Sequence, residues 1–163
     1  MYLEKAKLEE FEAYYEIKCE KFNTFWTWGN YELPPKENLY RFYCKCLEVT
    51  EQPAKEIYFI KNSDKQIVGY IYMDYHGDMV DIPIALKESE TGKGYARYAI
   101  KAGLAMAKEQ GLMRSEVEIR EDNESSIRLY TSCGYKKGRE TRKLYSEALE
   151  KEISMYAYEC IIE

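Results

Sequence analysis

Apolar residues recur at helical spacing in the first third of the chain. In "KLEEFEAYYEIKCEKF" (7–22) they stand three or four positions apart and predict an amphipathic helix with a face formed by Leu8, Phe11, Tyr15 and Cys19. A second helix is expected after "LPP", where prolines suit a helix start and an apolar stripe follows at Leu39, Phe42, Tyr43, Cys46 and Leu47. Between them, "NTFWTWGNYELPP" is expected to be a loop punctuated by glycine and proline. Its aromatic residues would serve either as a lid on a pocket or as a plug against the core.

The pattern changes at Glu56. The segments "EIYFI", "QIVGYIYMDYH" and "DMVDIPIAL" are rich in β-branched and aromatic residues, and turn-forming residues separate them, so they predict three hairpin-linked strands. A helix ending near Gln110, a strand "SEVEIR", a helix ending at "SCGY" and two tyrosine-rich strands should follow. The predicted order is β-α-α-β-β-β-α-β-α-β-β. Repeats and low-complexity tracts are absent, so residues 1–163 are expected to form one domain.

A glycine turn, "SETGKGYARYAI", precedes the helix that ends near Gln110. Small residues on one face of that helix would let it approach a sheet closely: Ala96, Ala99, Ile100, Gly103 and Ala107. Gly92 and Gly94 leave backbone N–H groups pointing outward, beside the positive end of the helix dipole. This combination suits a phosphate or pyrophosphate, although an ordinary strand-to-helix turn uses the same residues.

Two other phosphate-binding motifs fit poorly. "ESETGKGY" lacks the first glycine of a Walker A loop and the hydroxyl residue after its lysine. The dinucleotide fingerprint would need a third glycine and a place after the first strand of a parallel sheet.

The chain resembles the GNAT superfamily of acyl-CoA-dependent N-acetyltransferases in three places. The segment Thr91-Gly92-Lys93-Gly94-Tyr95-Ala96 resembles the family's Gln/Arg-x-x-Gly-x-Gly/Ala, with Thr91 in place of Gln or Arg. A second, more specific match is "NESSIRLYTSCGY", which carries the family's pattern at Asn123, Ser126, Ile127, Leu129, Tyr130, Gly134 and Tyr135. The third is the element order, in which "VDIPIAL" resembles a strand of the ribosomal-protein alanine acetyltransferase-like branch, with Asp81 at its acidic position.

The resemblance implies an α/β (α+β) domain with a mixed, mostly antiparallel sheet of about seven strands and helices on both faces. It further implies that acetyl-CoA binds in a gap between two splayed strands and gives its acetyl group directly to a primary amine in a ternary complex. The residues expected to bind the cofactor are the backbone of Ile84, Ala85 and Leu86, the turn Thr91, Gly92, Lys93, Gly94, Tyr95 and Ala96, and the side chains of Asn123, Ser126 and Tyr130. A helix N-cap is an equally suitable role for Asn123.

Thioester aminolysis needs an acid for the leaving thiolate and a route for the amine proton. Tyr130 shares a helix face with Asn123 and is the candidate acid; a packed core tyrosine is the alternative. Asp81 leads as the base and Glu118 is second; both could equally be solvated charges, and water could relay the proton. The only histidine, His76, stands in a turn, which is more typical of a surface residue.

Composition limits the partners. The net charge of −5, with basic residues spread along the chain, argues against a nucleic-acid partner. A charged N-terminus and the absence of a long apolar run argue for a cytoplasmic protein with no membrane segment. The five cysteines lack paired ligand spacing, so no metal is expected, and Cys133 has no histidine to activate it for a covalent route.

The expected partner is a cationic amine acceptor, with Trp26, Trp28 and Tyr31 as candidate walls of its pocket, and the chain is expected to be a monomer or homodimer. Two rival hypotheses remain: a non-catalytic acyl-CoA-binding regulatory module, and a relative that shares the fold without using CoA.

Overall fold

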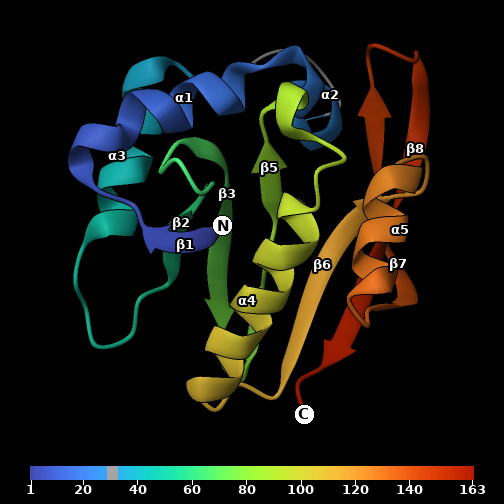
Figure 1. Cartoon of the computed structure of the whole chain (residues 1–163). Helices are drawn as coiled ribbons and strands as arrows, with labels where there is room; N and C mark the ends of the chain where they lie inside the picture. Colours follow the sequence, from blue (N-terminus) through green and yellow to red (C-terminus); the bar gives the residue numbers. More distant parts are fainter. Residues whose placement is uncertain (29–32) are drawn as a thin grey trace.

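The computed structural model describes residues 1–28 and 33–163, except for the side chains of residues 27 and 28. Its centre is an eight-stranded sheet in the order β1-β2-β3-β4-β6-β8-β7, with β5 pairing β3 (Figure 1). The strands are β1 Tyr2–Lys5, β2 Lys55–Lys61, β3 Ile67–His76, β4 Met79–Asp81, β5 Ile84–Leu86, β6 Arg114–Arg120, β7 Lys136–Ser146 and β8 Lys151–Ile161. All pairs are antiparallel except β4 with β6. The expected mixed, mostly antiparallel sheet is confirmed.

Helices cover both faces of the sheet, as expected (Figure 1). On one face lie α1 Phe11–Cys19, α2 Lys21–Trp28 and α3 Lys36–Leu47, and on the other lie α4 Tyr95–Glu109 and α5 Glu124–Ser132. Two short 3-10 turns, Leu8–Glu10 and Glu88–Glu90, complete the elements. Tyr14 and Ile17 bury themselves against β2 and β3, while Ala99 packs on the opposite side of the same strands.

The N-terminal helices differ from the sequence prediction. The first six residues of the segment expected as a loop, 23–28, belong to α2, which begins where the Glu20 carbonyl accepts from the backbone N–H groups of Asn23 and Thr24. Its aromatic and short polar residues are weak helix formers, so burial of Asn23 and Thr24 against the rest of the fold stabilises it. In α1 the buried face contains Phe11, Tyr14 and Ile17, whereas Leu8 is 53% exposed.

The strand predicted in "DMVDIPIAL" is divided into β4 and β5. Both halves pair with β3 in one register, because Asp81 lies opposite Asp74 and Ile84 lies opposite Ile71. The ladder is interrupted between them, at residues 82–83. This interruption accounts for eight strands where about seven were expected, because the N-terminal strand was already among the seven.

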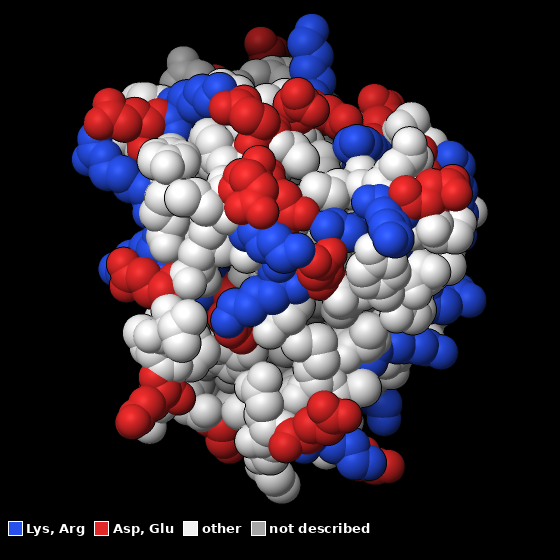
Figure 2. Space-filling view, turned by 60° about the vertical axis from the view of Figure 1, so that its left-hand side comes forward, with Lys and Arg blue, Asp and Glu red and all other residues white. Residues whose placement is uncertain are grey.

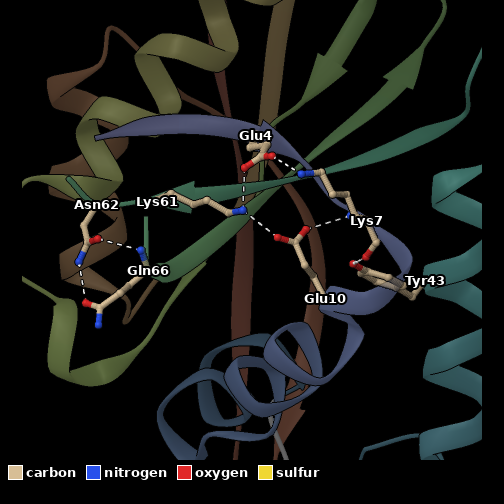
Figure 3. Close-up of polar contacts among 7 residues, drawn as sticks. All are labelled: Glu4, Lys7, Glu10, Tyr43, Lys61, Asn62 and Gln66. Carbon is tan, nitrogen blue, oxygen red and sulfur yellow. Dashed lines mark hydrogen bonds and ion pairs between the residues drawn. The ribbon is translucent and has the colours of Figure 1, made fainter. Parts of the chain in front are cut away.

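A polar cluster anchors the N-terminal strand (Figure 3). Lys61, which is 8% exposed, donates to Glu4 at 2.6 Å and to Glu10 at 2.7 Å. Tyr43 of α3 donates to the Lys7 carbonyl at 2.6 Å. These bonds tie β1 and the first 3-10 turn to β2 and α3, so a buried ammonium is compensated by two carboxylates.

The surface around this cluster mixes both signs of charge. In Figure 2, which brings this side of the molecule forward, acidic and basic side chains of the described residues are interspersed, with no continuous basic stripe on this face. The sheet ends on the far side at β7, whose residues are almost all exposed. That strand carries five basic residues and one acidic residue. No helix in the described ranges 1–28 and 33–163 is long and apolar enough to cross a membrane.

Candidate active site

The sheet opens between β4/β5 and β6. β4 and β6 pair only through Met79–Asp81 and Arg114–Glu116, and beyond this β5 pairs with β3 while β6 pairs with β8. A cavity of about 740 Å³ lies in the opening. One wall is residues 83–86 and the other is residues 117–120, so the splayed strands expected from the sequence are present.

Backbone polar groups of β5 face this cavity at every second residue. Tyr72 donates its N–H to the Pro83 carbonyl, and Lys87 donates to the Val68 carbonyl, so the odd-numbered residues bond to β3. The groups of Ile84 and the N–H of Leu86 therefore point toward the cavity. By the same alternation the backbone groups of Ala85 face Tyr70 of β3 and not the cavity, which differs from the free backbone expected there, although Ala85 does line the cavity.

The glycine turn lies at one end of the cavity. Gly92 and Gly94 have φ values of +75° and +87°, which side chains other than glycine rarely tolerate. Thr91 donates its hydroxyl to the Glu88 carbonyl at 2.8 Å and so closes the preceding turn. Residues 91, 92 and 94–96 line the cavity. Lys93 does not, and its ammonium pairs with Glu90 at 3.0 Å instead.

Two arginines that the sequence prediction missed also line the cavity. Arg97 lies in the first turn of α4, three residues after Gly94, and Arg128 comes from α5. For Arg97, the signal available in the sequence was its position one helical turn beyond the glycines. Arg97 stands six residues after Thr91, where the family motif has Gln or Arg, and Arg128 also pairs with Glu124 at 3.5 Å.

Tyr130 lies at the junction of the two walls. Its side chain is 3% exposed, lines the cavity and donates its hydroxyl to the Ile82 carbonyl at 2.7 Å. Burial raises the pKa of Tyr130 well above 10, with a smaller contribution from nearby Tyr135. The phenol is therefore protonated at neutral pH and its proton faces the strand interruption.

An acidic row crosses the α1–α3 side of the sheet. Register places Asp74, Asp81 and Glu116 side by side on β3, β4 and β6, and Glu118 follows two residues along β6. Val80, which alternates with Asp81, is buried on the α4 side. Four carboxylates thus share one face, defined here as the acidic row.

The two candidate bases in the acidic row have opposite environments. Burial raises the pKa of Asp81 to about 6, and its Oδ1 is buried with no hydrogen-bond partner among the described residues. Partial burial acts in the same direction on Glu118, but hydrogen bonds from Arg142 and Thr141 outweigh it and lower the pKa of Glu118. Glu118 lines the cavity, whereas Asp81 lies beside it.

Comparison with known protein families identifies the family to which this chain belongs. Residues 11–135 match the acetyltransferase (GNAT) family. The chain belongs to the GNAT family. It is an acetyl-CoA-dependent N-acetyltransferase that acts on an amine.

Relatives of this GNAT enzyme cover nearly its whole length. A putative [ribosomal protein bS18]-alanine N-acetyltransferase of Bacillus subtilis is 25% identical over 154 residues, covering 92% of this chain and 90% of the relative. Spermidine N-acetyltransferase from Vibrio cholerae, solved with CoA and spermine, superposes with a TM-score of 0.85 at 14% identity, covering 99% of this chain and 95% of that one. Ribosomal-protein-alanine N-acetyltransferase from Brucella melitensis gives 0.81 at 17% identity, covering 99% of both chains.

Other residues singled out in the GNAT sequence have structural surroundings of their own. Asn123 caps α5 by accepting from the Ser126 N–H at 3.1 Å, and both residues line the cavity. Trp26 lines the cavity, while the Trp28 side chain and Tyr31 lie outside the described residues. His76 is exposed and 3.4 Å from Asp74.

The thiol nearest Tyr130 in the sequence is that of Cys133, three residues along the chain. Burial raises the pKa of Cys133, which keeps its thiol protonated. The described residues contain no group of three or more His, Cys, Asp or Glu side chains placed to hold a metal ion.

Proposed function

We propose that acetyl-CoA lies along the cleft between β5 and β6, and that a primary amine attacks its thioester directly in a ternary complex. The observation that supports this most is the parting of the two strands beside a glycine turn and a helix N-terminus. The opening leaves cleft-facing backbone groups on β5, which suit the amide groups of a pantetheine arm. The glycine turn suits the pyrophosphate of the same molecule.

The cofactor's charged end is proposed to bind at the start of α4. The outward N–H groups around Gly92 and Gly94 would bind pyrophosphate oxygens, with Arg97 and Arg128 supplying the charge. Asn123 is proposed to orient the first turn of α5, and Ser126 to contact the cofactor there.

The thioester is proposed to lie beside the strand interruption. There the Ile84 N–H would polarise its carbonyl oxygen. As the amine forms the new C–N bond, the C–S bond breaks and the thiolate leaves. Tyr130 is proposed to protonate this thiolate, because its hydroxyl is neutral, positioned and held only by the Ile82 carbonyl among the described residues.

Asp81 is proposed to accept the amine proton, directly or through one water. Its pKa of about 6 leaves it ionised near neutral pH while keeping it a stronger base than an ordinary aspartate. Glu118 fits this role less well because Arg142 and Thr141 occupy its oxygens. Its proposed role is to shape the acceptor side of the cleft.

The acceptor is proposed to be cationic and to approach from the side of the acidic row. Three of the four carboxylates have basic partners, namely Lys55, Arg139 and Arg142, so Asp81 contributes the uncompensated negative charge. Two amine classes are suggested by the relatives: a polyamine, as in the Vibrio cholerae enzyme, and an alanine N-terminus, as in the Bacillus subtilis one.

The test measures free CoA thiol released from acetyl-CoA with spermidine and with a short peptide beginning with alanine. Wild-type turnover with one amine is expected, and Tyr130→Phe should reduce kcat by about a hundredfold or more. Acetyl-CoA affinity should stay within about twofold, because the hydroxyl bonds to the protein. An unchanged kcat in Tyr130→Phe would remove the acid assignment. Tight acetyl-CoA binding without turnover of either amine would contradict the proposed acceptor classes.

A further inference from the structure

Helix α2 is connected to both of the parted strands. From its first turn Asn23, which is 7% exposed, donates its side-chain amide to the Leu86 carbonyl of β5 at 2.9 Å. The same nitrogen donates to the Ile17 carbonyl of α1 at 2.8 Å. One buried amide therefore fastens the helix start to one wall of the cleft.

Arg120 makes the connection from the opposite wall. It ends β6 and is 1% exposed, yet its guanidinium donates across the molecule to the Phe25 carbonyl of α2 at 2.7 Å. Two further bonds reach Asp122, at 3.0 and 2.9 Å. A guanidinium this buried is costly unless its charge and donors are satisfied, and here one neighbouring carboxylate and one carbonyl do so.

The same guanidinium sets the surroundings of Trp26. Its central carbon lies 5.0 Å from the ring centroids of both Phe25 and Trp26. The two rings meet edge to face, with centroids 4.7 Å apart. Trp26 lines the cavity, so a cation–π contact fixes one of its walls.

We propose that Asn23 and Arg120 are positioning residues that hold α2 as a crosspiece between β5 and β6 and thereby fix Trp26 as a wall of the acceptor site. The inference rests on the proposed function, in which the acceptor approaches from the α1–α3 side of the sheet, the side on which α2 lies. Because the crosspiece contacts both walls, it sets their separation as well as the position of the indole. Acceptor binding should therefore depend on it more strongly than acetyl-CoA binding does.

A spectroscopic test follows from the tryptophan count. The chain has two tryptophans, so Trp28→Phe leaves Trp26 as the only indole emitter. In that background, Arg120→Lys keeps the charge but loses the planar contact with the ring and the paired bonds to Asp122. Trp26 emission should shift to longer wavelength and become more accessible to acrylamide. Asn23→Ala should produce the same kind of shift by releasing the other end of the helix.

Kinetics in the chain that retains Trp28 complete the test, with spermidine or the alanine peptide as acceptor, whichever the wild type acetylates. Each variant should raise the acceptor KM about tenfold while the acetyl-CoA KM changes less than twofold. The double variant should lose less than the product of the single effects, because both bonds act on one helix.

Lys61→Met is the matched control. It removes another buried cation held by carboxylates, in the cluster of Figure 3, which shares no residue with the cleft lining. It should lower stability without moving Trp26 emission or the acceptor KM.

The outcomes separate positioning from mere stabilisation. Arg120→Lys and Asn23→Ala variants that only lower the melting temperature, as the control does, would overturn the proposal. Equal increases in both KM values would overturn it as well. If Trp26→Ala left the acceptor KM unchanged while Arg120→Lys still shifted Trp26 emission, Trp26 would not be a wall of the acceptor site, and only the attachment of α2 would stand.

Discussion

At the scale of single residues, Asp81 combines a cost in stability with a proposed use in catalysis. Its carboxylate is ionised at neutral pH although one oxygen is buried without a partner among the described residues. Perturbed carboxyl groups of this kind concentrate at functional sites. Replacing Asp81 should therefore raise the stability of the protein and lower its activity.

The stability prediction concerns Asp81→Asn. The folded pKa is raised from 3.8 to about 6, so the folded state holds the proton more tightly and wild-type stability falls as pH rises through that window. Above about pH 6 the variant should be more stable by on the order of 1 kcal/mol, after allowance for partial exposure. The gain should vanish below about pH 4. Urea unfolding at both ends of the range measures it.

The same variant should acetylate the amine about a hundredfold more slowly and lose the acidic limb of the pH–rate profile near pH 6. Glu118→Gln is the matched carboxylate control, and it should retain the acidic limb of the pH–rate profile. An Asp81→Asn enzyme that is both more stable and fully active would contradict the proposed role of Asp81. Water alone would then accept the amine proton.

At the scale of elements, the first turn of α4 explains how the enzyme manages with Thr91. The family motif has Gln or Arg at this position, and the threonine hydroxyl is used to close the preceding turn. Arg97 lies one turn into the helix and lines the cavity, so the charge reaches the same region from another residue. Thr91→Arg should then tighten acetyl-CoA binding only modestly.

Arg97→Gln is expected to weaken acetyl-CoA binding about three- to tenfold, because it removes a charge-assisted contact with a phosphate. Titration calorimetry at low and high salt measures the effect, which should shrink as salt rises. Lys101→Gln changes a cation one turn further along α4 that does not line the cavity, and should have little effect. Equal losses of acetyl-CoA affinity in the two variants would show that the effect comes from general electrostatic attraction and not from a contact of Arg97 with the phosphate.

Most elements could be predicted from local patterns, and α2 shows why one could not. Periodicity and turn residues located the strands and α3 to α5, because those elements carry apolar faces or glycine ends of their own. The segment 21–28 has weak helix formers, and its stability comes from contacts that sequence reading cannot see. Arg120 is 95 residues away from the carbonyl that it binds on α2.

The candidate site could likewise be predicted only in part, where its residues belong to local motifs. The glycine turn, Asn123, Ser126 and Tyr130 belong to motifs and do line the cavity. Lys93 has the right sequence neighbours, but its amine turns toward Glu90. The difference between Asp81 and Glu118 depends on Arg142, which the final hairpin brings to β6 from a distant part of the chain. Such pairings require the tertiary structure.

At the scale of the whole molecule, the cleft divides the sheet into two parts joined by a short pairing of β4 with β6 and by α2. A bound cofactor that contacts both walls should hold the parts together. Acetyl-CoA at about a hundred times its Kd should raise the free energy of unfolding by about 2.7 kcal/mol. Thermal unfolding at increasing acetyl-CoA measures this.

Inorganic phosphate at matched ionic strength is the control for that measurement, because it can occupy the glycine turn without spanning the cleft. A shift of the same size with phosphate would show that the turn alone accounts for the stabilisation.

The outermost strand, β7, bears on how copies of the enzyme meet. An exposed sheet edge of eleven residues invites a strand from another molecule. Here that edge carries five basic residues and one acidic residue, in a chain whose overall charge is negative. Two such edges repel each other at close range, so crowded copies are kept from joining their sheets into a continuous one. The basic strand is thus expected to disfavour edge-to-edge association of copies, while its Arg142 also lines the cleft and pairs with Glu118.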